Sequence, residues 1–65
     1  MEASALARLG RGDKLLALIE GERVMVRFSS WAVRGSTERV AVLVAHGSQR
    51  YLEIIATEDL LEVAG

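Results

Sequence analysis

The sequence predicts a mainly β fold, in which five short strands form a small barrel after a short N-terminal helix. Three observations support this prediction. Apolar and polar residues alternate with a period of two between Glu22 and Ser30, two apolar runs flank the pair Glu20-Gly21, and further short apolar runs separated by turn residues follow up to Ala64. Closing such short strands into a barrel removes the unpaired edges of an open sheet. An open sheet of α+β type is the alternative.

Residues 1–65 are predicted to form one domain, because a chain of this length holds at most one small core. Residues 2–9 are rich in alanine and leucine, which are strong helix formers, and Gly10 is a usual helix stop. They predict a short helix that must dock on the rest of the chain to be stable. The barrel is assigned to residues 14–64.

The clearest β-hairpin signal lies on either side of Glu20-Gly21, where the glycine supplies the positive φ that a tight turn needs. The run before this pair is apolar on both faces, so a helix from Asp13 to Glu22 competes with a strand for residues 13–20. In the run after it, alternate side chains are expected to face the core and the solvent. Those facing the core are Val24, Val26 and Phe28, and those facing outward are Arg23, Met25 and Arg27.

The second half of the chain is predicted to contain three more strands, one tight turn and one longer loop. Residues 57–60 are expected to form a single helical turn, with the Thr57 side chain accepting hydrogen bonds from the backbone N–H groups ahead of it. One helical turn before the last strand favours an SH3-like barrel over an OB-like one. In chain order the other elements are the loop 31–37, the strand 40–45, the turn 46–49, and the strands 50–56 and 61–64.

Composition favours a self-associating, non-enzymatic domain. Hydrophobic residues make up 51% of the 65 positions and the mean hydropathy is +0.25, although so small a domain has much surface to cover with polar groups. Burial against a second copy hides surplus apolar surface, so we expect a homo-oligomer. The chain has no cysteine and a single histidine, His46, which excludes disulfides, cysteine nucleophiles and His clusters. We predict no catalytic residues, no metal site and no cofactor.

The charged residues are unevenly distributed along the chain. Residues 1–50 carry eight basic and five acidic side chains, whereas residues 51–65 carry four acidic ones, for a net charge of −1. The whole molecule therefore lacks a basic field that attracts nucleic acid. Five arginines are a candidate phosphate patch, but pairing with nearby glutamates is the favoured interpretation. The arginines are Arg23, Arg27, Arg34, Arg39 and Arg50, and the glutamates are Glu20, Glu22 and Glu38.

The expected location is the cytoplasm, with no membrane partner. The N-terminus lacks the charged start and long apolar stretch of a secretory signal. No apolar run approaches the roughly 18 residues that a membrane-spanning helix needs.

The two longest patterned stretches are residues 15–31 (LLALIEGERVMVRFSSW) and residues 40–63 (VAVLVAHGSQRYLEIIATEDLLEV). The first resembles the opening hairpin of Sm-like proteins, including their bacterial RNA-chaperone branch, and the second is similar to their later strands. The resemblance implies an SH3-like fold, shared with KOW-type modules, and binding of RNA, protein or a larger assembly. The D-x-x-x-N loop and Tyr-Lys-His motif of the RNA-binding members do not occur here. Arg50-Tyr51 is the nearest counterpart, so the fold is expected to carry over without the RNA site.

The single tryptophan, Trp31, lies at the end of the second predicted strand. If the alternation continues without interruption, its side chain shares the outer face and forms an apolar and basic stripe, which suits a protein interface. The alternative is a β-bulge at Ser29-Ser30, after which the Trp31 side chain points inward and fills the open end of the barrel. The candidate interface residues are Met25, Arg27, Trp31, Val33 and Arg34.

These observations predict a non-enzymatic binding or assembly module that self-associates and binds protein. The alternative is an Sm-like or KOW-like module that binds RNA, in which basic side chains hold phosphates and aromatic side chains stack on bases. The candidate residues for that alternative are Arg23, Arg27, Trp31, Arg34, Arg50 and Tyr51.

Overall fold

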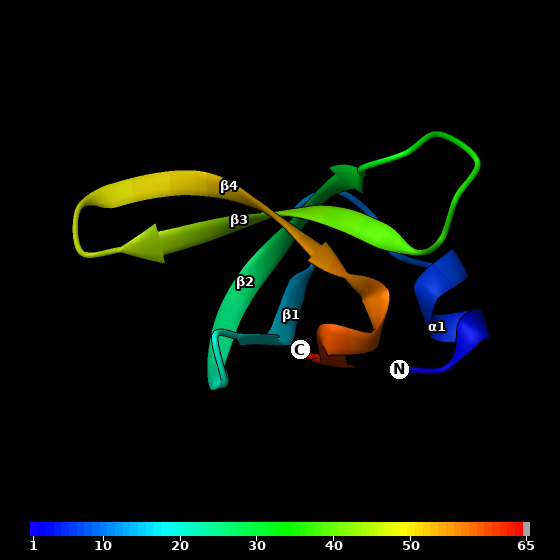
Figure 1. Cartoon of the computed structure of the whole chain (residues 1–65), viewed down its shortest axis with the longest axis horizontal. Coiled ribbons are helices and arrows are strands. Elements are labelled where there is room, and N and C mark those ends of the chain that lie inside the picture. The colour runs from blue at the N-terminus through cyan, green and yellow to red at the C-terminus, as the bar shows by residue number, and fades with distance from the viewer. Residues whose placement is uncertain (65) are drawn as a thin grey trace.

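The computed structural model describes residues 1–64 as one short helix, five β-strands and one 3₁₀ turn (Figure 1). This confirms the predicted mainly β class. Within these residues no helix has the length and apolar character needed to cross a membrane. In chain order the elements are α1 (Ala3–Ala7), β1 (Lys14–Ile19), β2 (Glu22–Trp31), β3 (Arg39–His46), β4 (Gln49–Ala56), the 3₁₀ turn η1 (Thr57–Asp59) and β5 (Leu60–Val63).

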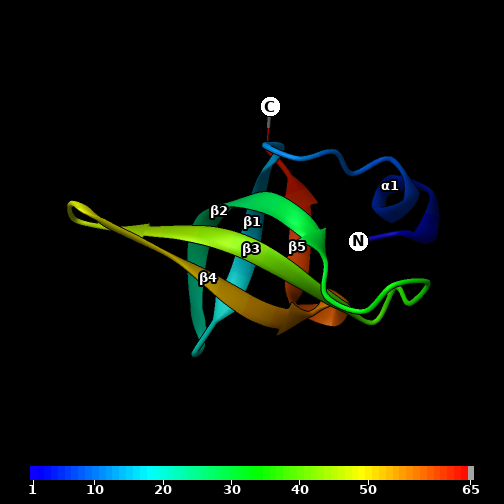
Figure 2. The ribbon, with the colours of Figure 1, turned by 90° about the horizontal axis from the view of Figure 1, so that it is seen from above.

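All five strands belong to one sheet, in the order β4-β3-β2-β1-β5, and every neighbouring pair is antiparallel. The sheet is twisted and curled, and η1 connects the end of β4 to the start of β5 (Figure 2). In the part of the chain that the structure describes, no ladder joins β4 to β5, so these strands are the two edges of an open sheet. The predicted closure into a barrel is therefore not confirmed.

β1 and β2 form the hairpin predicted at Glu20-Gly21, and residues 14–19 are a strand rather than the competing helix. Glu20 has a φ of 51° and Gly21 a φ of 79°. A two-residue turn with positive φ at both central positions is a type I′ turn, whose twist matches that of the flanking strands. The turn therefore helps to set the register that places Ile19 opposite Glu22.

The type I′ turn allows a direct test of backbone strain. Glu20→Asn is expected to stabilise the fold by up to about 1 kcal/mol, because asparagine adopts the left-handed conformation more readily than glutamate. Gly21→Ala is expected to destabilise it by about 1–2 kcal/mol, although nothing lies within 4 Å of the added Cβ. Urea denaturation followed by circular dichroism measures both. The control is Gly10→Ala, where the added Cβ meets Asp13 Oδ2 at 3.8 Å and no positive φ is involved. Equal losses of stability in Gly21→Ala and Gly10→Ala would contradict the explanation by backbone strain at Gly21.

One face of the curled sheet holds the hydrophobic core. Val26 and Phe28 are buried there as predicted, and Val24 is partly buried against them. Because α1 has only five residues, it depends on docking, which Leu6 provides by packing against the core. The buried residues of this core cluster are Leu15, Ala17, Val26, Phe28, Val40, Val42, Val44, Ile55 and Leu60.

β3 and β4 form a hairpin that projects beyond the rest of the sheet (Figure 1). β3 pairs with β4 along its whole length, but its pairing with β2 begins only at Leu43, opposite Arg27. Residues 44–46 of β3 and residues 22–26 of β2 therefore have no strand partner on the sides that face each other. At the tip, Gly47 has a φ of 63°, as the first central position of a type II′ turn requires.

The predicted helical turn is η1, but Thr57 has a different role from the predicted one. Ala56 occupies the N-cap position, and no side chain caps η1. The Thr57 hydroxyl instead donates a hydrogen bond to the Glu38 carbonyl oxygen at 3.4 Å, and the Thr57 backbone N–H bonds to the same oxygen at 2.9 Å. Since β4 continues to Ala56, Thr57 already lies inside the turn and fastens it to the loop between β2 and β3.

Candidate functional site

Trp31 does not lie on the outer face, so the predicted stripe is wrong for this residue. The pairing of β2 with β3 shifts between Phe28 and Ser30, which leaves Ser29 as an extra residue. A bulge of this kind interrupts the alternation of side chains. The Trp31 and Phe28 rings meet edge to face, with centroids 5.6 Å apart and an angle of 68° between their planes. Trp31 is therefore partly buried against the core, as the bulge alternative predicts.

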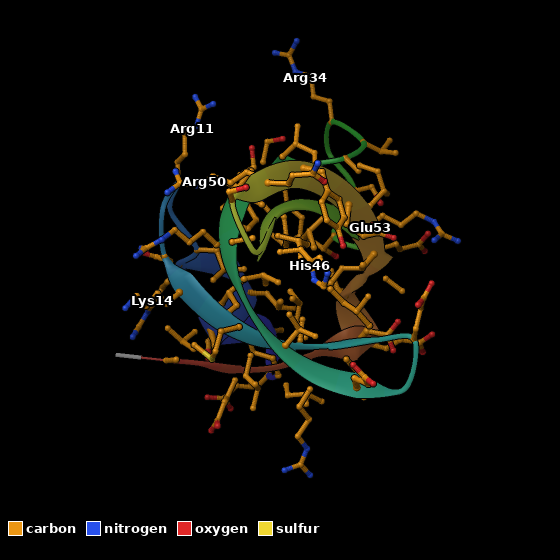
Figure 3. All side chains as sticks on the ribbon, turned by 90° about the vertical axis from the view of Figure 1, so that its left-hand side faces the viewer. Arg11, Lys14, Arg34, His46, Arg50 and Glu53 are labelled. Carbon is orange, nitrogen blue, oxygen red and sulfur yellow. The ribbon has the colours of Figure 1, made fainter. Side chains whose placement is uncertain are left out.

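Met25 and Arg27 lie on the outer face of β2, as predicted, and both are exposed. Arg27 Nη1 donates a hydrogen bond to the Gly12 carbonyl oxygen at 2.9 Å, which holds the guanidinium beside the start of β1. Val33 and Arg34 lie in the loop between β2 and β3 instead. Figure 3 shows Arg34 extending from that loop, apart from the other labelled basic side chains. The candidate interface residues therefore do not form one surface.

A groove on the outer face collects residues from four strands at the point where β2 and the β3–β4 hairpin diverge. Its floor is apolar, and basic side chains from β1, β2 and β4 surround it. The volume is about 250 Å³, below the roughly 300–1,000 Å³ of sites that enclose a small molecule. This outer groove therefore suits a few side chains of a macromolecule. It is lined by Lys14, Met25, Val26, Arg27, Leu43, Ala45 and Arg50.

A second hollow adjoins the outer groove and shares Arg27 and Leu43 with it. It adds Arg11 from the loop before β1 and Leu52 from β4. In Figure 3, Arg11, Lys14 and Arg50 lie on one side of the molecule. The fold thus gathers basic side chains that are distant in the sequence around a shared apolar floor.

The register shows whether the strand arginines face glutamates directly across neighbouring strands. No arginine in a strand has a carboxylate as its directly paired residue. Glu22 lies opposite Ile19, and Glu20 lies in the turn between β1 and β2. The pairs are Arg23 with Leu18, Arg27 with Lys14 and Leu43, Arg39 with Ala56, and Arg50 with Ala45.

The residues predicted for the RNA-binding alternative are spread over the molecule. Arg27 and Arg50 meet in the outer groove. Tyr51 lies opposite the buried Val44, whereas Arg50 lies opposite the exposed Ala45, so the predicted polar-aromatic pair is divided between the two faces of β4. The remaining residues of that set lie elsewhere: Arg23 toward the β1–β2 turn, Trp31 against the core and Arg34 in the loop.

The two edge strands carry most of the exposed large apolar side chains. Five of the eight such residues lie on β4 or β5, and among residues 1–64 neither strand has a strand partner on its outer side. The Met1 ammonium donates a hydrogen bond to the Leu60 carbonyl oxygen at the start of β5, at 3.4 Å. Surface apolar residues scattered singly are normal in proteins, but contiguous ones usually mark an interaction site. On β4 they are Tyr51, Leu52 and Ile54, and on β5 they are Leu61 and Val63.

His46 and Glu53 of the hairpin do not lie side by side. His46 lies opposite Gln49 at the hairpin tip, whereas Glu53 lies opposite Val42. Four residues of strand separate the two positions, which is about 13 Å. Among residues 1–64, no three His, Asp or Glu side chains gather in a way that could hold a metal ion.

Besides Val26, which was predicted as a core residue, three residues of the outer groove were not predicted as site residues: Lys14, Leu43 and Ala45. Each lies in a run that is mostly apolar, and no local motif distinguishes it. The alternation of β1 and β3 assigns these side chains to the outer face only once the register with β2 is known. The missing signal is thus the pairing of strands, which a single sequence does not display.

The chain matches no family model, and comparison with curated proteins and with solved structures finds no significant match. The resemblance to Sm-like proteins stays a prediction from the sequence pattern.

Proposed function

We propose that this chain is a non-enzymatic assembly module that self-associates through the edge strands β4 and β5 of an SH3-like sheet. The observation that carries the proposal is that both edges of the open sheet are unpaired and hold five of the eight exposed large apolar side chains. A cytoplasmic location and binding of a further protein are the accompanying predictions.

An unpaired edge strand offers a row of backbone donors and acceptors to another strand. When a strand from a second copy pairs with it, the backbone groups bond across the junction and the side chains on both strands are buried. On β4, Leu52 and Ile54 point to the same face, two residues apart, and provide adjacent apolar contacts. Self-association therefore pairs the backbone groups of the edge and buries its apolar side chains in the same contact.

Pairing of β4 with β5 of the next copy is favoured over pairing of two β5 edges. Two β5 strands in antiparallel contact bring the exposed Glu62 carboxylates of both copies near each other, and like charges at that distance destabilise a strand pair. A head-to-tail contact leaves one free edge at each end, so it continues until a ring closes or a filament forms. The mass in solution distinguishes these assemblies from a dimer.

The test is absolute mass by light scattering after size exclusion, at micromolar concentration, for the wild type and two variants. Ile54→Lys places a charge on the β4 edge and is expected to reduce the mass to that of a monomer. Val33→Lys is the matched control, because Val33 is 55% exposed and Ile54 is 54% exposed, but Val33 lies in a loop. It is expected to leave the mass unchanged.

Two outcomes would overturn the proposal. A monomeric wild type at this concentration removes self-association altogether. A loss of mass in Val33→Lys but not in Ile54→Lys assigns the interface to the β2–β3 loop, as the predicted residues Val33 and Arg34 imply. Circular dichroism of each variant confirms that a change in mass is not a loss of folding.

A further inference from the structure

We propose that the outer groove binds an extended acidic segment of a partner protein, which inserts as a strand between β2 and the projecting part of β3. This binding surface differs from the β4 and β5 edges, so it goes beyond the proposed self-association.

The backbone provides the first part of the site. β2 and β3 pair only from Arg27 and Leu43 onward, so residues 22–26 and residues 44–46 have no ladder on their facing sides. Met25 and Val26 of the first segment and Ala45 of the second line the groove where the two strands begin to diverge. Both segments are strands that are held on their other sides, by β1 and by β4. A peptide strand placed where the strands diverge finds a preformed strand edge to pair with, which lowers the ordering cost of binding.

The side chains of the groove determine the chemistry of that peptide. Successive side chains of a strand point to opposite faces of a sheet. The side chains that point to the outer face would lie beside Lys14, Arg27 and Arg50, which line the groove. The register places Arg27 and Arg50 directly opposite uncharged or basic residues, so neither faces a carboxylate directly across its ladder. Arg27 already donates one hydrogen bond from Nη1 to the Gly12 carbonyl oxygen, and its other N–H groups are donors for a ligand carboxylate.

The opposite set of peptide side chains would meet an apolar environment. Val24 and Val26 of β2 and Val44 of β3 point to the core face, and all three are at least partly buried. A segment in which acidic and apolar residues alternate therefore complements both faces of the gap. The basic side chains on the outer face and the apolar side chains on the core face both favour this alternating peptide.

A protein segment fits these features better than a nucleic acid. Single-stranded nucleic acids are usually bound on aromatic side chains that stack with the bases. No aromatic residue lines the outer groove, and Tyr51 lies on the other face of β4 from Arg50. The groove therefore offers charge for phosphates but no stacking platform.

The test uses a fluorescein-labelled peptide of about eight residues in which Glu and Val alternate, long enough for one typical strand. Fluorescence anisotropy is measured against the full chain at low and moderate salt. The double variant Lys14→Ala/Arg50→Ala is expected to weaken binding roughly tenfold, since it removes two exposed charge pairs of modest strength. The matched control, Arg8→Ala/Arg34→Ala, removes the same charge from exposed positions outside the groove and is expected to change affinity less than twofold.

Hydrogen exchange followed by NMR adds a measurement that simple charge attraction does not affect. Amide exchange in residues 22–26 and 44–46 is expected to slow when the peptide binds, because backbone pairing protects those amides. Slower exchange in β4 or β5 instead would assign the peptide to the sheet edges and overturn the proposal. No saturable binding at low salt would also overturn it.

Two further probes separate the remaining alternatives. A peptide with Lys in place of Glu is expected not to bind, and oligouridine of similar length is expected to bind more weakly than the acidic peptide. Tighter binding of oligouridine with the same dependence on Lys14 and Arg50 would make the groove a nucleic-acid site. Equal losses of peptide affinity in both double variants would mean that binding depends only on the overall charge of the protein, which would overturn the proposal. Light scattering of the Lys14→Ala/Arg50→Ala variant shows separately whether self-association is retained.

Discussion

Replacing Phe28 with alanine is expected to destabilise the fold by about 3–5 kcal/mol, as large-to-small changes of buried aromatic residues do. Phe28 is 5% exposed, belongs to the core cluster and meets Trp31 edge to face. A chain of this length has a total free energy of unfolding of roughly 3–10 kcal/mol. The substitution therefore removes a large part of the stability and leaves the variant partly or wholly unfolded.

Urea denaturation followed by circular dichroism measures this loss, and Trp31 fluorescence reports on the same contact. Phe28→Leu is the control, because a smaller change in volume retains most of the apolar burial and costs less. Its loss is expected to stay below about 2 kcal/mol. A loss below about 1 kcal/mol for Phe28→Ala would mean that this side chain is not part of the packed core.

The second large effect is a dependence of thermal stability on protein concentration. If copies associate only when folded, association stabilises the fold by about 2.7 kcal/mol at one hundred times the dissociation constant. Since 1 kcal/mol shifts the Tm of a small domain by about 4–8 °C, the Tm is expected to rise by roughly 10–20 °C over that range. Differential scanning calorimetry at several concentrations measures the change.

Ile54→Lys is the control for this experiment as well. Ile54 is 54% exposed, so the substitution creates no cavity in the monomer. The Tm of the Ile54→Lys variant is expected to be independent of protein concentration, because the variant does not self-associate. A wild-type Tm that does not change with concentration would contradict self-association within the range studied.

The strands could be predicted from the sequence because local patterns specify them. Period-two alternation identified β2, and Glu20-Gly21 identified the turn before it. The strand and helix alternatives for β1 could not be separated in the same way, since a short run that is apolar on both faces has no distinct period. Pairing with β2 and β5 decides that element.

The orientation of Trp31 could not be predicted, because it depends on a single extra residue. Ser29 is accommodated as a bulge only because Phe28 and Trp31 both find apolar contacts on the core side of β3. A shift of one residue moves every following side chain to the other face of a strand. Local sequence contains both possibilities, and tertiary packing selects between them.

The candidate site was even less accessible from the sequence. Lys14, Leu43 and Arg50 come together because β1, β2, β3 and β4 are consecutive neighbours in the sheet. The place where β2 and β3 diverge is equally a property of the whole sheet. The alternation in β2 predicted which of its side chains face outward, but it did not predict which side chains of other strands become their neighbours.

The projecting β3–β4 hairpin also offers a handle for spectroscopy. Its tip, Gly47-Ser48, lies at the far end of the hairpin from the β2–β3 junction (Figure 1). Because the chain contains no cysteine, a single thiol introduced at Ser48 accepts one dye or spin label at a defined position. Distances measured between such labels on different copies would report the spacing of protomers in an assembly without altering either strand edge.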